Sequence, residues 1–388
     1  MKSVSVPVAY VPLVDAAPLI IAHEMGFAEA EGIALDLIAA PSWSSLRDML
    51  AFGRVDAAHM LSPLPVAMAM GLGGVTTAVS AVSVLSVNGN VIGVGAPLEE
   101  KLRNAGYGFD FADPIRAARA LAAAREGPIK FGVPFPFSMH VALLRYWARA
   151  SDLGPQGIEI RTVPPPLMAR ALADGDVDAF CVGEPWGSVA VEQGVGALLL
   201  PGKAIWSFAP EKVLAVRTDW AEMEPDLLGR LMRAVWKAGR WLSDPDVAAT
   251  ASDLLSRKAY LDVPSELIDR ALSGHLTVSA RGESRRIDGF LEFHRGVANF
   301  PWRSQAKWIA RQLRQSHPEV AITEKIAGVF RADLHRMHLG SLENDLPGAS
   351  EKVEGAILQA MPVASAGGGL TLQPNRFFDG EIFDPAAI

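Results

Sequence analysis

Hydrophobic and polar positions follow strand and helix periods in turn along the first part of the chain. Strand patterns over 4–8 and 33–38 alternate with helical patterns over 17–25 and 44–52. A second series repeats this order, with strands predicted over 129–133, 158–163 and 179–182 and helices over 140–150 and 166–173. Such alternation predicts an α/β fold with mostly parallel sheets covered by helices.

One phrase occurs twice, about 120 residues apart. It reads GRVDAA at 53–58 and GDVDAF at 175–180, and each copy ends a helical pattern and begins an apolar run. Two similar α/β halves predict two lobes, and open α/β sheets bind ligands beyond the carboxyl ends of their strands. We therefore expect a small ligand in a cleft between the lobes.

The same patterns predict how the chain divides between the lobes. Residues 1–98 and 213–388 are expected to form a discontinuous first lobe with a helical C-terminal extension, and 99–212 the second lobe. A helical pattern runs from 226 to about 325, where Trp236 and Trp241 are interpreted as packing residues. Residues 367–388 are rich in Gly, Pro and aromatic residues without periodicity, which predicts an irregular tail on the surface.

Composition excludes several classes of function. The formal net charge is −7, which argues against general nucleic-acid binding. The only cysteine, Cys181, permits neither an internal disulfide nor a cysteine zinc cluster. The sequence shows no Gly-rich phosphate loop, metal-ligand cluster or nucleophile beside a base, so we expect neither an enzyme nor a cofactor.

Two segments bear on membranes and export. The stretch 60–97 has no charged residue, but prolines and glycines divide it into pieces too short to span a bilayer. The first ten residues fit an alternating strand rather than a secretory leader, so we expect a cytoplasmic protein.

Four motifs carry a resemblance to a known family. They are Ser42-Trp43, the segment VPPP at 163–166, CVGEPW at 181–186 and PEK at 210–212, and FFDG at 377–380 adds a further match. The chain resembles the nitrate- and bicarbonate-binding family of solute-binding proteins. This resemblance implies a two-lobed, periplasmic-binding-protein-like (type II) fold with one small oxyanion in the cleft.

Because no leader is evident, the chain resembles most the cytoplasmic NasS-type nitrate/nitrite sensors of that family. The resemblance implies an ANTAR-type RNA-binding antiterminator (NasT-type) as partner, which nitrate or nitrite releases. The alternative is the receptor of an ABC transporter for nitrate or bicarbonate. The sequence does not rank nitrate against nitrite.

The resemblance also implies ligand contacts. A weakly hydrated planar monoanion needs fixed donors, a nearby positive charge and little water. Lys212 is expected to supply the charge, because it matches a lysine of the nitrate-binding relatives. The bicarbonate-binding relatives have an acidic residue there and recruit calcium, so Lys212 favours nitrate or nitrite. His140, at a predicted helix start, and Trp43, at a strand-to-helix turn, are expected to donate N–H groups. A capping histidine, a core tryptophan and a solvated lysine are the alternatives.

Four further contacts are expected, each with a structural alternative. Asn88 aligns with a glutamine of the nitrate-binding relatives and is shorter. Val182 and Gly183 offer main-chain donors, and Pro165 shapes the same wall, although a purely structural turn explains these three equally well. We interpret His59 as a core histidine outside the site, and we expect Glu184 to face away or to pair with a base.

Overall fold

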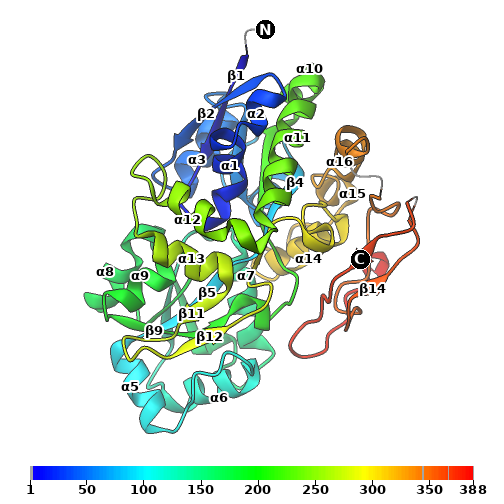
Figure 1. Cartoon of the computed structure of the whole chain (residues 1–388). Helices are drawn as coiled ribbons and strands as arrows, with labels where there is room; N and C mark the ends of the chain where they lie inside the picture. The colour runs from blue at the N-terminus through cyan, green and yellow to red at the C-terminus, as the bar shows by residue number, and fades with distance from the viewer. Residues whose placement is uncertain (1–2, 343–344, 366, 388) are drawn as a thin grey trace.

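The computed structural model describes residues 3–342, 345–365 and 367–387. The first lobe was predicted to begin at residue 1 and the tail to end at 388, and residues 1–2 and 388 lie outside the described residues. The chain forms two α/β lobes, one above the other in Figure 1, with a C-terminal region beside them.

Lobe I is built around a sheet in the order β13-β4-β10-β3-β1-β2. Its elements are β1 (Val4–Tyr10), η1 (Val14–Ala16), α1 (Ala17–Glu24), α2 (Phe27–Ala30), β2 (Ile33–Ala39), α3 (Trp43–Ala51), β3 (Ala57–Leu61), α4 (Pro63–Ala69), β4 (Val79–Asn88), β10 (Pro210–Arg217), α10 (Thr218–Met223), α11 (Pro225–Leu242) and β13 (Leu291–Glu292). The strand pairs β1–β2 and β1–β3 are parallel, whereas β10 runs antiparallel to β3 and β4.

Lobe II is built around a sheet in the order β7-β6-β8-β5-β9. Its elements are β5 (Asn90–Gly95), α5 (Ala96–Asn104), α6 (Pro114–Ala124), β6 (Ile129–Val133), α7 (Met139–Arg149), η2 (Pro155–Gly157), β7 (Ile158–Thr162), η3 (Pro165–Leu167), α8 (Met168–Ala173), β8 (Ala179–Gly183), α9 (Trp186–Glu192), β9 (Gly196–Pro201) and η4 (Gly202–Ala204). Strands β6, β7 and β8 are parallel, and β5 is antiparallel to β8 and β9.

The remaining elements follow α11. They are η5 (Pro245–Val247), α12 (Ala248–Ser256), α13 (Ser265–Ser273), β11 (His275–Thr277), β12 (Ser284–Arg286), η6 (Arg295–Val297), α14 (Arg303–Arg314), α15 (Glu324–Ala327), α16 (Ala332–Leu339), β14 (Met361–Pro362), β15 (Thr371–Leu372) and η7 (Pro385–Ala387). Within the described residues, no helix is both long and apolar enough to cross a membrane.

The repeated phrase marks equivalent positions of the two lobes, as predicted. Gly53 and Gly175 have φ of 72° and 75°, and each follows the helix that leads into a central strand, β3 or β8. The Asp56 N–H donates to the Pro7 carbonyl at 2.9 Å, and the Asp178 N–H donates to the Lys130 carbonyl at 2.8 Å. Strands β1, β2 and β3 are parallel, as are β6, β7 and β8, but both main sheets are mixed rather than mostly parallel. The antiparallel pairs involve β4, β5 and β10, which adjoin the crossings between the lobes.

The lobe boundaries differ from those predicted at 98/99 and 212/213. Strand β5 already belongs to the sheet of lobe II, so the chain first crosses at Gly89, between β4 and β5. It returns between Pro201 and Pro210. A crossing needs a sharp turn, which Asn88 (φ 61°) and Gly89 (φ 88°) supply. The predicted boundary at 98/99 instead falls within helix α5 of lobe II.

The predicted helical region from 226 to 325 is interrupted. The helical pattern ends at Gly274, which has φ of 70°, and β11, β12 and β13 follow before α14 begins. The β11–β12 hairpin extends toward lobe II, because the Leu198 N–H donates to the Val278 carbonyl at 2.7 Å. The C-terminal extension therefore contacts both lobes.

The tail is irregular, as predicted, but its aromatic residues are buried. Phe377 is 2 % exposed and stacks on Trp308 of α14 with ring centroids 5.6 Å apart. The Tyr146 hydroxyl on α7 donates to Asp379 at 2.7 Å. The tail therefore holds α14 against α7 of lobe II.

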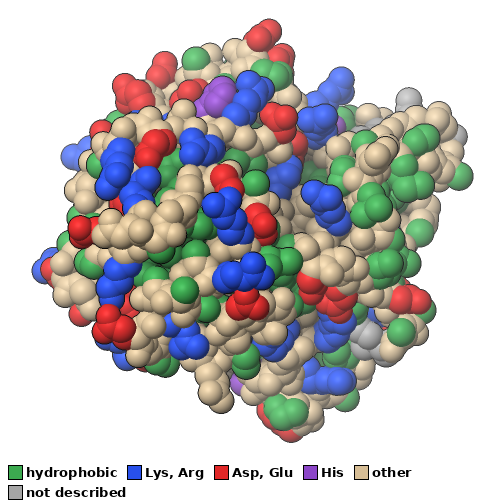
Figure 2. Space-filling view, turned by 90° about the horizontal axis from the view of Figure 1, so that it is seen from below, with side chains coloured by type: hydrophobic (Ala, Val, Ile, Leu, Met, Phe, Trp, Pro, Cys, Tyr) green, Lys and Arg blue, Asp and Glu red, His purple; other side chains and the backbone are tan. Residues whose placement is uncertain are grey.

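The face seen from below carries acidic and basic side chains interspersed (Figure 2). No single-sign patch of the kind that binds a nucleic-acid backbone stands out on this face.

Gly89→Ala is expected to lower the free energy of unfolding by about 1–3 kcal/mol. Gly89 has a positive φ, and an added Cβ would lie 2.6 Å from Leu291 Cδ1. Thermal unfolding measures the effect. Gly108→Ala is the matched control, since nothing lies within 4 Å of its added Cβ, and equal melting temperatures for the two variants would contradict the prediction.

Candidate functional site

Six buried side chains meet between the lobes, and we call them the cleft cluster. They are Asp15 (η1), Trp43 (α3), His59 (β3), His140 (α7), Glu211 and Lys212 (β10). None is more than 2 % exposed. In both lobes the carboxyl ends of the central parallel strands face the cleft. This shared orientation brings the six side chains together.

Helix starts position two members of the cluster. Ser42 caps α3 by accepting from the Ser45 N–H at 3.1 Å, which makes Trp43 the first residue of that helix. Ser138 caps α7 by accepting from the Val141 N–H at 3.2 Å, so His140 lies in the first turn. Both residues therefore lie where two helices begin at the cleft.

Lys212 is the central member of the cluster. Its Nζ lies 2.7 Å from Asp15 Oδ2 and 2.9 Å from Glu211 Oε1. Burial alone lowers the pKa of this ammonium, but the two carboxylates outweigh burial and hold the pKa above its ordinary value. The ammonium also lies 5.5 Å from the centre of the Trp43 ring. Lys212 is therefore a buried, charged lysine, and a solvated lysine is excluded.

The histidines flank this ion pair. His59 Nε2 lies 2.9 Å from Asp15 Oδ1, and His140 Nδ1 lies 3.4 Å from Glu211 Oε1. Burial lowers the pKa of His59, and burial lowers the pKa of His140 to about 4. Burial opposes ionisation of Asp15, but Lys212 and His59 hold the pKa of its carboxyl well below the usual range. The cluster thus combines the carboxylates of Asp15 and Glu211, the ammonium of Lys212 and two imidazoles whose neutral form burial favours.

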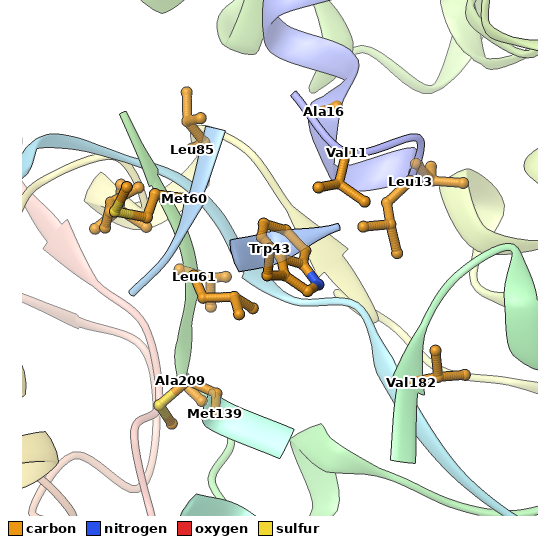
Figure 3. Close-up of a cluster of buried hydrophobic side chains, with 14 of the residues drawn as sticks. Val11, Leu13, Ala16, Trp43, Met60, Leu61, Leu85, Met139, Val182 and Ala209 are labelled. Carbon is orange, nitrogen blue, oxygen red and sulfur yellow. The ribbon is translucent and has the colours of Figure 1, made fainter. Parts of the chain in front are cut away.

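Donors without partners point to the ligand position. Trp43 Nε1 and both ring nitrogens of His140 are buried and make no hydrogen bond. Figure 3 shows the Trp43 ring nitrogen directed toward the space between Leu13 and Val182. A buried polar group left unsatisfied costs about 1–3 kcal/mol. These nitrogens therefore favour a small polar molecule bound beside Lys212.

Gly183 lies against the same space. A Cβ at this position would approach Leu13 Cδ2 to 2.8 Å, Asp15 Oδ2 to 3.6 Å and His140 Nε2 to 4.0 Å. Because glycine has no side chain, the space beside Asp15 and His140 stays open to a ligand. Together with Val182, which is fully buried at the end of β8, it forms the lobe II wall of the site.

The lobes are closed over the cluster. The Trp186 indole of lobe II donates to the Pro12 carbonyl of lobe I at 3.0 Å, and the Val14 N–H donates to the Glu184 carbonyl at 2.9 Å. Open hollows lie elsewhere, such as one of about 310 Å³ beside Lys101 and Asp178 on lobe II. The cluster is an enclosed site that depends on lobe closure.

The structure therefore brings together Trp43, His140, Val182, Gly183 and Lys212 of the predicted contacts. It does not bring Asn88 to the cluster: Asn88 Nδ2 donates to the carbonyls of Ser207 at 3.1 Å and Gly289 at 3.5 Å, and its Oδ1 accepts from the Ala209 N–H at 3.2 Å. Its amide is therefore bonded to the crossing segments, and its contact with the ligand stays a prediction.

Pro165 is buried at the start of η3, and its described contacts do not join it to the cluster. Glu184 faces away, as expected, and its Oε2 accepts from the Ser188 N–H at 3.1 Å. Among the described residues, no base forms an ion pair with it. Burial raises the pKa of its carboxyl to about 7.

Sequence reasoning missed Asp15 and Glu211 and placed His59 outside the site. Asp15 is the only acid in the apolar run from Val11 to Ile21, which follows the strand predicted over 4–8. Asn90 was also missed, and its Nδ2 donates to Glu211 Oε2 at 2.6 Å. A lone acid in an apolar segment is the signal that could have identified Asp15. Among the described residues, no group of three or more His, Cys, Asp and Glu side chains is arranged to hold a metal ion.

The fold and the enclosed polar site define a two-lobed solute-binding protein of the periplasmic-binding-protein type II class. The chain belongs to the NMT1-like family, which it matches over residues 1–256, and within it to the nitrate- and bicarbonate-binding proteins. These are binding proteins, and the chain is not an enzyme.

Several relatives carry this assignment. The nitrate/nitrite binding protein NrtA of Synechocystis sp. PCC 6803 is 30% identical over 392 residues, which is 97% of this chain and 81% of NrtA. The crystal structure of the periplasmic nitrate-binding protein NrtA from Synechocystis PCC 6803 superposes with a TM-score of 0.83 at 27% identity, covering 99% of this chain and 96% of that one.

A further relative is the nitrate import ATP-binding protein NrtC of Synechocystis sp. PCC 6803. It is 33% identical over 319 residues, which is 81% of this chain but 46% of NrtC. The chain thus spans about half the length of this curated relative.

Lys212→Met is expected to lower the free energy of unfolding by about 3–5 kcal/mol, because it leaves the carboxylates of Asp15 and Glu211 buried without a cation. Urea denaturation at pH 7 measures this effect, and adding Asp15→Asn to the variant should restore part of the loss. Lys101→Met is the control, since Lys101 pairs with Glu126 on the surface. An unchanged stability of Lys212→Met would show that the cluster is not assembled as described.

Glu184→Gln is expected to stabilise the protein at alkaline pH. Because the pKa of Glu184 is raised from 4.5 to about 7 in the folded protein, the folded state holds a proton that the unfolded state has lost, and stability falls as pH rises from about 4.5 to about 7. The variant should therefore match the wild type near pH 4.5 and exceed it by about 3 kcal/mol near pH 8.

Thermal unfolding across this pH range tests the prediction. Glu126→Gln, an exposed glutamate, serves as the control and should leave the pH profile unchanged. If the stability of Glu184→Gln varied with pH in parallel with that of the wild type, the raised pKa of the buried Glu184 carboxyl would be contradicted.

Proposed function

We propose that this protein is a cytoplasmic nitrate/nitrite sensor, which binds the anion in the cleft cluster and thereby controls release of an ANTAR-type RNA-binding antiterminator. One observation carries the anion-binding step: Trp43 Nε1 and His140 Nε2 are buried without a hydrogen bond in the cluster that holds the ammonium of Lys212. A planar oxyanion accepts hydrogen bonds from such donors and gains from the adjacent positive charge. Full-length relatives named as nitrate/nitrite binding proteins support the ligand class.

Lobe closure supplies the means of signalling. The anion site lies between the lobes, and the contacts of Trp186 with Pro12 and of Val14 with Glu184 form only when the lobes meet. An anion that binds the closed form alone shifts the open–closed equilibrium toward closure by its binding free energy. A partner that recognises the open form would then be released.

Some relatives carry the region similar to this chain inside a longer protein. In NrtC and in the bicarbonate transport protein CmpC, the region similar to this chain is part of a protein named for ATP binding. The region similar to this chain therefore also occurs as one part of longer proteins.

A second candidate is the receptor of a nitrate or bicarbonate ABC transporter. The full-length superposition on a periplasmic nitrate-binding protein favours it. Cell fractionation distinguishes the two, because a transport receptor faces the outside of the membrane and a sensor of this kind lies in the cytoplasm. Calorimetry with nitrate, nitrite and bicarbonate, with and without calcium, identifies the ligand.

Trp43→Phe is expected to weaken nitrate binding about tenfold, since it keeps the ring but removes one hydrogen-bond donor to the anion. Isothermal titration calorimetry measures the affinity, and Trp241→Phe on α11, remote from the cluster, should bind as the wild type does. An unchanged affinity of Trp43→Phe would exclude the indole from the site.

The sensor role requires a second readout. The purified antiterminator should bind the nitrate-free protein and dissociate as nitrate is added, and Trp43→Phe should shift this release to about tenfold higher nitrate. Release that does not depend on nitrate or nitrite would contradict the sensor role and leave anion binding intact.

A further inference from the structure

His140 lies between a carboxylate and the expected position of the anion. Its Nδ1 is 3.4 Å from Glu211 Oε1, and its Nε2 lies on the side of Gly183, where an added Cβ would come within 4.0 Å. The ring is 1 % exposed, and neither nitrogen makes a hydrogen bond. The imidazole thus has Glu211 on one side and the ligand space on the other.

This position has a consequence for hydrogen bonding. A neutral imidazole has one N–H donor and one lone pair, whereas an imidazolium has two donors. If the single proton of a neutral His140 is on Nδ1, the lone pair of Nε2 faces the anion; if it is on Nε2, a lone pair faces Glu211. Only the imidazolium donates to both Glu211 and an oxyanion.

The charge of the cluster leads to the same requirement. Asp15 and Glu211 carry two negative charges, and Lys212 carries one positive charge. A monoanion added to this buried group without a compensating proton would raise its net negative charge, which is costly away from water. Lys212 is already protonated and cannot supply the compensation.

The other titratable groups near His140 do not replace it. His59 on β3 is beside Asp15, with 2.9 Å between Nε2 and Oδ1, on the far side of the ion pair. Cys181 on β8 is fully buried, and burial raises the pKa of its thiol, which keeps it neutral. Asn90 donates to the remaining oxygen of Glu211 but does not titrate.

We propose that nitrate or nitrite enters the cleft cluster together with one proton, held by His140 between Glu211 and the anion, and that Glu211 is the residue that imposes this requirement. The inference rests on the proposed anion-binding function. Because the free histidine is neutral at physiological pH, each binding event takes a proton from solution. Affinity therefore falls as pH rises, by up to about tenfold per pH unit for one proton.

Calorimetry of the full chain with sodium nitrate, in two buffers of different ionisation enthalpy, counts the protons. We expect uptake approaching one proton per nitrate near pH 7 and an affinity that decreases between pH 6 and pH 8. Nitrate binding without proton uptake and with constant affinity overturns this inference and leaves the proposed function standing. Absence of nitrate binding from pH 5 to pH 8 contradicts the proposed function itself.

Variants assign the proton. Glu211→Gln removes the carboxylate and should reduce both the proton uptake and the pH dependence. Since Glu211 also contacts Lys212 and Asn90, His140→Gln is the second variant, and any nitrate binding that it retains should be independent of pH. His23→Gln, exposed on α1, should behave as the wild type. Loss of proton uptake in His59→Gln with retention in His140→Gln would overturn the assignment to His140.

Discussion

The ammonium of Lys212, shared between Asp15 and Glu211 inside the closed molecule, is the interaction on which the binding site is built. An ion of this kind is costly to bury unless its partners are close and well oriented. Here the partners come from different parts of lobe I: Asp15 follows β1, and Glu211 and Lys212 lie on β10, which follows the second crossing. The ion pair therefore forms only when the segment after β1 and strand β10 have folded into the same sheet, with the chain passing through lobe II and back between them.

The same ion pair determines what the cleft can bind. Two carboxylates already neutralise Lys212, so the positive charge alone does not make the site attractive to an anion. The donors of Trp43 and His140, and the space that Gly183 leaves open, are needed as well. Selection among ligands is then a matter of donor geometry and of protonation, rather than of the net charge of the whole chain.

Much of the fold could be predicted because it depends on local pattern. The repeated phrase at Gly53 and Gly175 correctly indicated two equivalent lobes, since both glycines end a helix with positive φ before a central strand. The lobe boundary was misplaced because the crossing at Gly89 depends on strand pairing between distant segments. Composition around the crossing gives no sign of which sheet β5 joins.

The site could be predicted in part. Lys212, His140 and Trp43 were found through motifs, and the structure places them in one cluster. Asn88 was assigned to the ligand although its amide is bonded to main-chain groups of the crossing segments. Asp15 and His59 were missed because their importance comes from contact with β10, about 150 to 200 positions later in the chain.

The most direct test of the central claim is a crystal structure of the protein with bound nitrate. We expect a nitrate ion between the lobes, within hydrogen-bond distance of Trp43 Nε1 and His140 Nε2, with Lys212 still held by Asp15 and Glu211. A nitrate ion bound elsewhere, with these nitrogens still lacking a partner, would contradict it.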